Sequence, residues 1–124
     1  MKQILKIFCI EDDTVFRRAI KLFLEKEIDC DVTCFSSGEE FFQNLYLNPD
    51  IVTVDYNLPG MSGLEIIKQI KNYNQDILAV VVSGQEDVRV AVEAYKSGAK
   101  YYVVKDTTVL PELSLCIQNL TSTI

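Results

Sequence analysis

The 124-residue sequence contains no histidine and no tryptophan, and its four cysteines do not form a metal-binding pattern. The absence of histidine excludes the usual catalytic triads and the commonest general base. Cys30 and Cys34 lack a second pair at zinc-site spacing, so we expect no zinc site. Cys9 and Cys116 fall within apolar patterns and are expected to be small core residues.

The sequence also lacks an excess of positive charge and a long apolar run. Its net charge of −6 disfavours non-specific binding to nucleic acid or anionic membranes. The first apolar stretch ends at Glu11, so this stretch is too short for a signal peptide or a membrane span. We therefore expect a cytoplasmic protein that contacts neither membrane nor nucleic acid directly. Hydrophobic residues make up 48% of the chain, enough for a single domain over residues 1–124.

Five short apolar runs are typical of buried β-strands. The most informative is Ile51–Asp55, which lies between Asn48-Pro49 and Pro59-Gly60 and ends on a carboxylate. The predicted strands are Ile4–Ile10, Asp31–Phe35, Ile51–Asp55, Ile77–Val82 and Tyr101–Val104.

Between the strands, apolar residues recur at helical spacing. Capping boxes at Ser37/Glu40 and Ser62/Glu65 predict the start of two helices. Thr14 is expected to cap the first helix, Gly98 to end the fourth, and Pro111 to lie in the first turn of the last. The residues expected to face the core are Phe16, Ile20, Phe23, Leu24, Phe41, Phe42, Leu45, Tyr46, Leu64, Ile67, Ile70, Val88, Ala91, Val92, Tyr95, Leu113, Cys116, Ile117 and Leu120.

Apolar strands that alternate with amphipathic helices predict an α/β protein with a parallel sheet covered on both faces. The carboxyl ends of its strands meet at one edge, where open α/β sheets bind ligands. Four of these ends carry functional groups: Glu11 and Asp12, Asp55, Ser83, and Lys105.

Converging carboxylates repel one another, and a hard divalent cation such as Mg²⁺ removes that conflict. A carboxylate can also attack phosphorus and form an aspartyl phosphate. Lys105 and Ser83 would then hold the phosphoryl oxygens. The residues alone thus favour Mg²⁺-dependent acceptance of a phosphoryl group by Asp55.

These residues also lie in segments that closely resemble the receiver domain of two-component response regulators. The matching segments, found in this order, are Ile10–Asp13, Val54–Gly63, Val82–Gly84, Ser97–Ala99 and Tyr102–Lys105. The resemblance implies a flavodoxin-like (βα)5 fold, a doubly wound parallel sheet with strand order 2-1-3-4-5. It also implies a phosphorylation-dependent signalling switch that catalyses only its own phosphorylation and dephosphorylation.

The resemblance further implies a role for each site residue. Asp55 is the phosphoacceptor, Lys105 contacts the phosphoryl group, and Ser83 is the switch hydroxyl. The Mg²⁺ ligands are Asp12, Asp55, Glu11 through water, and Asn57 through its backbone carbonyl. Tyr102 corresponds to the aromatic side chain that moves on activation, and Asn57 and Gln85 to positions that tune phosphate lifetime. The output surface comprises the fourth helix, the fifth strand and the last helix.

The sequence departs from the family at two positions. Asp106 follows Lys105 where most receivers have proline, so a cis-proline bond cannot shape this loop. The Lys-Asp pair resembles the subgroup that is joined to a helix-turn-helix output domain. Gly84 replaces the commoner alanine, which should leave the phosphorylation site more open.

The implied partners are a sensor histidine kinase or a phosphotransfer protein, and a downstream protein or an output domain outside these residues. A phosphorylation-dependent homodimer is a further option. Two other functions stay open: a phosphate-independent pseudo-receiver, and a small Mg²⁺-dependent phosphohydrolase with an aspartyl phosphate. Structural roles also stay open, with Asp55 as a cap, Lys105 as an ion-pair partner, Ser83 as a turn residue and Tyr102 as a core residue.

Overall fold

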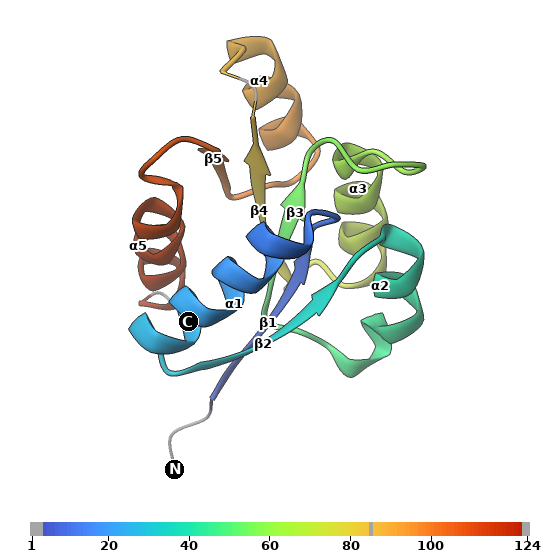
Figure 1. Cartoon of the computed structure of the whole chain (residues 1–124). Helices are drawn as coiled ribbons and strands as arrows, with labels where there is room; N and C mark the ends of the chain where they lie inside the picture. Colours follow the sequence, from blue (N-terminus) through green and yellow to red (C-terminus); the bar gives the residue numbers. More distant parts are fainter. Residues whose placement is uncertain (1–3, 85, 123–124) are drawn as a thin grey trace.

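A computed structural model of the chain describes residues 4–84 and 86–122, in which strands and helices alternate (Figure 1). The strands are β1 (Leu5–Ile10), β2 (Cys30–Phe35), β3 (Ile51–Asp55), β4 (Leu78–Ser83) and β5 (Tyr101–Val104). The helices are α1 (Thr14–Glu27), α2 (Gly38–Asn44), α3 (Gly63–Tyr73), α4 (Val88–Lys96) and α5 (Val109–Thr121), with a short 3₁₀ turn, η1 (Leu45–Leu47), after α2. Each helix of these ranges is too short or too polar to cross a membrane.

The strands form one parallel sheet in the order β2-β1-β3-β4-β5. This confirms the predicted α/β class and the strand order that the family resemblance implied. The chain reverses its direction of winding between β1 and β3, so the loops after these two strands diverge around a shared crevice. The β1–β3 register pairs Ile10 with Val54, which places the acidic residues after β1 beside Asp55.

Alternate side chains of the sheet build two separate hydrophobic cores. Phe8 and Ile10 of β1 point to the face covered by α2, α3 and α4, where Phe41, Ile66 and Ala94 pack. Ile7 and Cys9 point to the face covered by α1 and α5, where Ile20, Leu24 and Leu113 pack. The fully apolar strands follow from this arrangement, because both faces of a doubly covered sheet are buried.

Helix starts follow the sequence signals with one correction. The hydroxyls of Ser37 and Ser62 accept hydrogen bonds from the amides of Glu40 and Glu65, as the two capping boxes predict. The first helix is capped by Asp13 rather than by Thr14, because the Asp13 carboxylate accepts a hydrogen bond from the Phe16 amide at 3.0 Å. Asp13 is therefore the Ncap residue, and Thr14 is the first residue of the helix.

Several predicted core positions in η1 and on α4 are wrong. Tyr46 is 67% exposed, and on α4 the side chains of Val88, Val92 and Tyr95 are exposed while the small Ala94 is fully buried. Helix α4 contacts the sheet through its alanine face, so its larger apolar residues lie on the outside. Gly98 ends this helix as predicted, with φ +114.

The start of α3 lies so close to the end of β3 that position 63 requires a glycine. A Cβ atom on Gly63 would lie 2.8 Å from the Asp55 carbonyl oxygen and 2.9 Å from the Cα atom of Tyr56. The Gly63 amide instead donates a hydrogen bond to the Tyr56 carbonyl at 3.1 Å. The start of α3 is thereby fixed against the end of β3.

We expect Gly63→Ala to lower the free energy of unfolding by about 1–3 kcal/mol, because the new methyl group meets backbone atoms that cannot rotate away. Gly84→Ala is the matched control, since a Cβ atom there meets nothing within 4 Å. Urea denaturation of both variants measures the difference. Equal stability of the two variants would contradict this account of Gly63.

Candidate functional site

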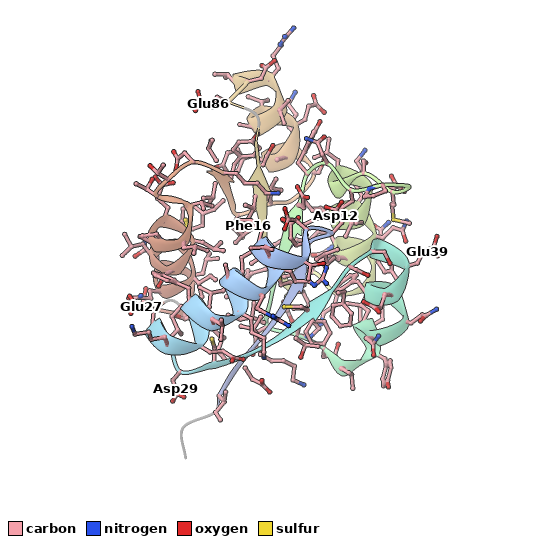
Figure 2. The ribbon with its side chains drawn as sticks, viewed as in Figure 1. Asp12, Phe16, Glu27, Asp29, Glu39 and Glu86 are labelled. Atoms are coloured by element: carbon pink, nitrogen blue, oxygen red, sulfur yellow. The ribbon has the colours of Figure 1, made fainter. Side chains whose placement is uncertain are left out.

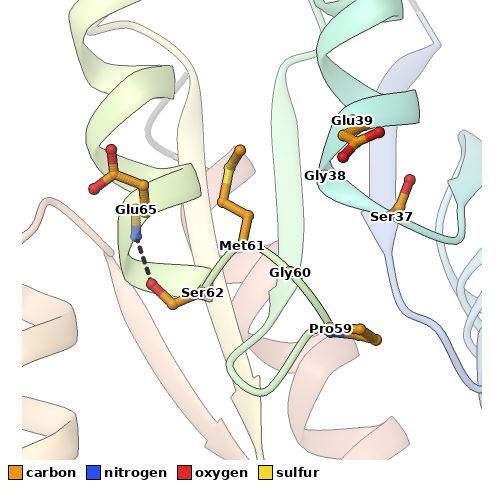
Figure 3. Close-up of a pocket in the computed structure, with 8 residues that line it drawn as sticks. All are labelled: Ser37, Gly38, Glu39, Pro59, Gly60, Met61, Ser62 and Glu65. Carbon is orange, nitrogen blue, oxygen red and sulfur yellow. Dashed lines mark hydrogen bonds between the residues drawn. The ribbon is translucent and has the colours of Figure 1, made fainter.

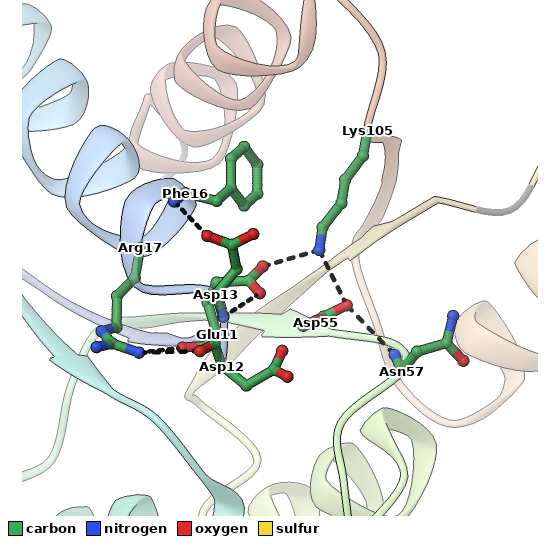
Figure 4. A network of polar contacts seen from close by, with 8 residues as sticks. All are labelled: Glu11, Asp12, Asp13, Phe16, Arg17, Asp55, Asn57 and Lys105. Atoms are coloured by element: carbon green, nitrogen blue, oxygen red, sulfur yellow. Dashed lines mark hydrogen bonds and ion pairs between the residues drawn. The ribbon is translucent and has the colours of Figure 1, made fainter.

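Three strand ends bring a compact set of charged groups together at the carboxyl edge of the sheet (Figure 4). Glu11 and Asp12 follow β1, Asp55 ends β3, and Lys105 follows β5. One carboxylate oxygen from each of the three acidic residues lies within 4.8 Å of the others. Figure 2 shows Asp12 and the neighbouring Phe16 together near this edge, whereas Glu27 and Asp29 lie at the other end of α1.

The acidic loop after β1, residues 11–13, is held by hydrogen bonds from α1, from its own backbone and to β2. Arg17 donates to the Glu11 carbonyl oxygen at 2.8 Å, and the Asp13 amide donates to the Glu11 carboxylate at 3.1 Å. The Glu11 amide donates to the Phe35 carbonyl on β2 at 3.0 Å. These bonds leave Glu11 buried, while Asp12 projects toward solvent beside it.

Lys105 is the cation of the cluster. Its Nζ atom lies 2.9 Å from Oε1 of Glu11 and 3.3 Å from Oδ1 of Asp55. The same ammonium stands 5.0 Å from the centre of the Phe16 ring, a cation–π contact that limits where the long side chain can go. Lys105 is thus positioned between two carboxylates from different strands.

Asp55 itself is buried and fixed at the backbone. The Asn57 amide donates to Oδ1 of Asp55 at 3.2 Å, and the Tyr56 amide donates to the Val82 carbonyl on β4 at 3.1 Å. Because the turn after β3 is tied to β4 and to the start of α3, the Asp55 carboxylate faces Lys105 and the acidic loop.

The charges of the cluster are out of balance. The pKa of Glu11 is raised to about 7: burial is the largest cause and the Asp55 charge adds to it, while Lys105 and the hydrogen bond from the Asp13 amide oppose them. Burial lowers the pKa of Lys105, but the hydrogen bond to Glu11 and the charges of Glu11 and Asp55 outweigh it and raise the pKa overall. Three carboxylates with one ammonium leave a local excess of negative charge, which attracts a cation.

The donor set fits a hard divalent cation. All three ligand groups are carboxylates from loops on one edge, which is the oxygen chemistry that Mg²⁺ and Ca²⁺ prefer. Mg²⁺ in particular binds through one or two carboxylates, water and phosphate oxygens, and the solvent-facing Asp12 leaves room for such ligands.

The remaining predicted site residues differ in their burial and in their contacts. Ser83 is fully buried at the end of β4, and its carbonyl oxygen accepts a hydrogen bond from the Lys105 amide at 2.7 Å. Tyr102 on β5 is half-buried and packs against the core on the α2–α4 face. The side chain of Asn57 is exposed, and Gln85 lies outside the described residues.

The two departures from the family pattern have visible structural counterparts. In the loop after β5, the Asp106 carboxylate accepts hydrogen bonds from the amide and the hydroxyl of Thr108, at 2.9 and 2.8 Å. This side-chain turn shapes the loop at the position where the family resemblance led us to expect proline. Beside Gly84, a Cβ atom would meet nothing within 4 Å, in agreement with an open approach to the site.

Two residues of the site were not identified from the sequence. Phe16 was assigned only to the core and Arg17 was given no role, yet Phe16 contacts Lys105 and Arg17 holds the acidic loop. Their position one turn into the helix is a weak signal, since apolar and basic residues are common there.

A groove of about 560 Å³ lies beside the site but does not include the acidic cluster (Figure 3). It runs between the loop Pro59–Ser62 and the start of α2, and it carries Glu39 and Glu65. Its acidic lining differs from the mixed charges around Asp55.

Comparison with known proteins agrees with this geometry. A model of the response regulator receiver domain matches residues 7–113. The transcriptional regulatory protein YdfI of Bacillus subtilis is 32% identical over 105 residues, which cover 83% of this chain and 49% of that protein. The chain thus spans about half the length of the curated relatives it matches.

Solved structures show the same fold. A receiver domain protein from Clostridium thermocellum is 30% identical with a TM-score of 0.85, over 94% of this chain and 93% of that one. The beryllofluoride-activated receiver domain of DrrB has a TM-score of 0.89 at 22% identity, over 97% of this chain and 99% of that one. DrrB is a response regulator of Thermotoga maritima.

The raised pKa of Glu11 predicts a specific pH dependence when divalent cations are removed. The folded state keeps the Glu11 proton up to about pH 7, whereas the unfolded state releases it near the ordinary pKa of 4.5. The contribution of Glu11 to stability is therefore greatest below about pH 4.5 and is lost as the pH rises through 7, a loss of up to about 3 kcal/mol.

Urea denaturation in EDTA across this pH range, compared with Glu11→Gln, isolates the effect. The free energy of unfolding of the wild type should fall relative to that of the variant. Parallel curves for the two proteins would show that Glu11 titrates normally.

Proposed function

Because the chain belongs to the response regulator receiver domain family, we propose that Asp55 is the residue that accepts its phosphoryl group. The chain is a phosphorylation-dependent signalling switch, a phosphoacceptor module rather than an enzyme with a substrate of its own. The observation that supports Asp55 as acceptor is its position: a buried carboxylate that ends β3, 3.3 Å from the Lys105 ammonium and within 4.8 Å of two further carboxylates.

The phosphoryl step follows from these contacts. An oxygen of Asp55 attacks phosphorus, the bond between phosphorus and the imidazole nitrogen of a phosphohistidine breaks, and the imidazole leaves with its electron pair and takes up a proton. Lys105 moves its charge from the Asp55 carboxylate to the new phosphoryl oxygens. The Ser83 hydroxyl is the second group that we assign to these oxygens.

We assign the Mg²⁺ site to Asp12 and Asp55 directly, to Glu11 through water, and to the backbone carbonyl of Asn57. Bound Mg²⁺ supplies positive charge to the transferring phosphoryl group. The contacts of Glu11 support an outer position for this residue, because Lys105 and the Asp13 amide already occupy its carboxylate. Asn57 and Gln85 are our candidates for the residues that set phosphate lifetime.

The proposed switch couples Ser83 to the surface formed by α4, β5 and α5. When Ser83 turns toward a phosphoryl oxygen, Tyr102 on the neighbouring strand moves inward and changes this surface. Support comes from the β4–β5 register, which pairs Ser83 with Val104, and from the direct bond between the Lys105 amide and the Ser83 carbonyl. Exposed Val88, Val92 and Tyr95 give α4 an apolar side suited to a protein contact.

The proposed partners are of the kinds that receiver domains have. We propose a sensor histidine kinase or phosphotransfer protein as phosphoryl donor, encountered in the cytoplasm, where receiver domains typically act. The candidates that read the switch are a downstream protein, an output domain such as the helix-turn-helix type, and a second copy of the chain. Residues 1–124 are assigned as one receiver domain without direct contact to nucleic acid.

Phosphorylation of Asp55 is tested by intact mass after incubation with Mg²⁺ and acetyl phosphate. We expect one phosphoryl adduct that requires Mg²⁺, is absent in Asp55→Asn, and persists in Asp76→Asn, an exposed carboxylate on another loop. No adduct from either acetyl phosphate or a phosphorylated histidine kinase, with Mg²⁺ bound, would favour the phosphate-independent pseudo-receiver.

Beryllofluoride, which mimics the phosphoryl group, tests the switch. We expect the backbone amide chemical shifts of residues 86–106 to change when beryllofluoride and Mg²⁺ are added, while those of residues 38–47 change little. Ser83→Ala should still bind beryllofluoride but show a smaller change over residues 86–106. Unchanged shifts in this range, despite a response at Asp55, would overturn the proposed output surface.

A further inference from the structure

Cys34, on β2, opens onto a cavity beside α1 whose lining does not include the acidic cluster. The cavity measures about 180 Å³ and is lined by Thr14, Arg17, Arg18, Lys21 and Cys34. Cys34 is half-buried, and its Sγ atom lies 3.7 Å from the Arg17 carbonyl oxygen. A small polar molecule can therefore reach this thiol from solvent.

The surroundings of Cys34 favour its thiolate form. The pKa of Cys34 is lowered to about 7: the hydrogen bond with Cys9 is the largest cause and the charges of Lys21 and Arg17 add to it, while burial and the charge of Glu25 oppose them. The same hydrogen bond raises the pKa of Cys9. A thiolate near neutral pH that is accessible and flanked by cations has the features of an oxidisable cysteine.

Cys9 is the direct neighbour of Cys34 across the sheet. The β1–β2 register pairs Cys9 with Cys34, and both side chains belong to the core on the α1–α5 face. Neighbouring strands lie about 4.8 Å apart, within the roughly 4.4–6.8 Å range of Cα separations that disulfides use. Cys9 is fully buried, so an oxidant meets Cys34 first.

Cys30, on the same strand, provides an internal comparison. It is also half-buried, but burial and the charges of Glu25, Asp31 and Asp29 raise its pKa to about 11. Burial and Glu112 likewise raise the pKa of Cys116. Among the free cysteines, Cys34 is therefore the one whose environment favours reaction.

We propose that Cys34 is a redox-modification site at which hydrogen peroxide is the oxidant and Cys9 is the resolving thiol. The Cys34 thiolate attacks one peroxide oxygen, the O–O bond breaks, and water leaves after one proton is taken up, which gives a sulfenic acid. The Cys9 sulfur then attacks the Cys34 sulfur, a second water leaves, and a Cys9–Cys34 disulfide forms. One peroxide is reduced and two thiols are oxidised.

The reactivity of the unmodified protein is the first test. Limited alkylation with iodoacetamide at pH 7, followed by peptide mass mapping, should label Cys34 at least about tenfold faster than Cys30 or Cys116. Lys21→Gln should slow the labelling of Cys34 without a change at Cys116, whose pKa is raised by burial and Glu112. Equal rates at Cys34 and Cys30 in the wild type would overturn the proposal.

The products of peroxide treatment form the second test. We expect a dithiothreitol-reversible Cys9–Cys34 cross-link in the wild type, in Cys30→Ser and in Asp55→Asn, because the chemistry is independent of phosphorylation. Cys34→Ser should form no cross-link, and Cys9→Ala should accumulate a Cys34 sulfenic acid that dimedone traps. A persistent sulfenic acid in the wild type, with Cys9 still free, would contradict Cys9 as resolving thiol.

Discussion

The repulsion between carboxylates gathered at one sheet edge is the constraint around which the rest of the site is arranged. Glu11, Asp12 and Asp55 approach within 4.8 Å of one another, and Lys105 reaches two of them from another strand. Burial increases the cost of this charge, as the raised pKa of Glu11 records. The folded chain thus assembles an acidic cluster whose charge favours a bound cation.

Backbone contacts around the charged residues hold them in place against this repulsion. Arg17 holds the acidic loop by its carbonyl oxygen, the turn after Asp55 is tied to β4, and Gly63 lets α3 approach that turn closely. Phe16 limits the position of the Lys105 ammonium without neutralising it. The charged groups can thus change partners while the strands that carry them stay in place.

The sequence pattern predicted the strands and the members of the charged cluster, because the carboxyl ends of parallel strands meet at one edge of the sheet. The strand order was implied by the family resemblance. The sequence pattern was wrong about Val88, Val92 and Tyr95, since helical spacing identifies an apolar face but not whether a neighbouring alanine face packs instead. It also missed Phe16 and Arg17, whose roles depend on where the side chains of Lys105 and the acidic loop lie in space.

The sheet divides the interior into two cores whose side chains do not share partners across it. Ile7 and Cys9 alternate with Phe8 and Ile10 along a single strand, yet each pair packs with different helices. Because energetic coupling between substitutions requires shared contacts, changes on opposite faces should combine additively. The α1–α5 layer and the α2–α4 layer should thus respond to substitution as nearly independent stability units, joined mainly by the backbone that carries the acidic residues.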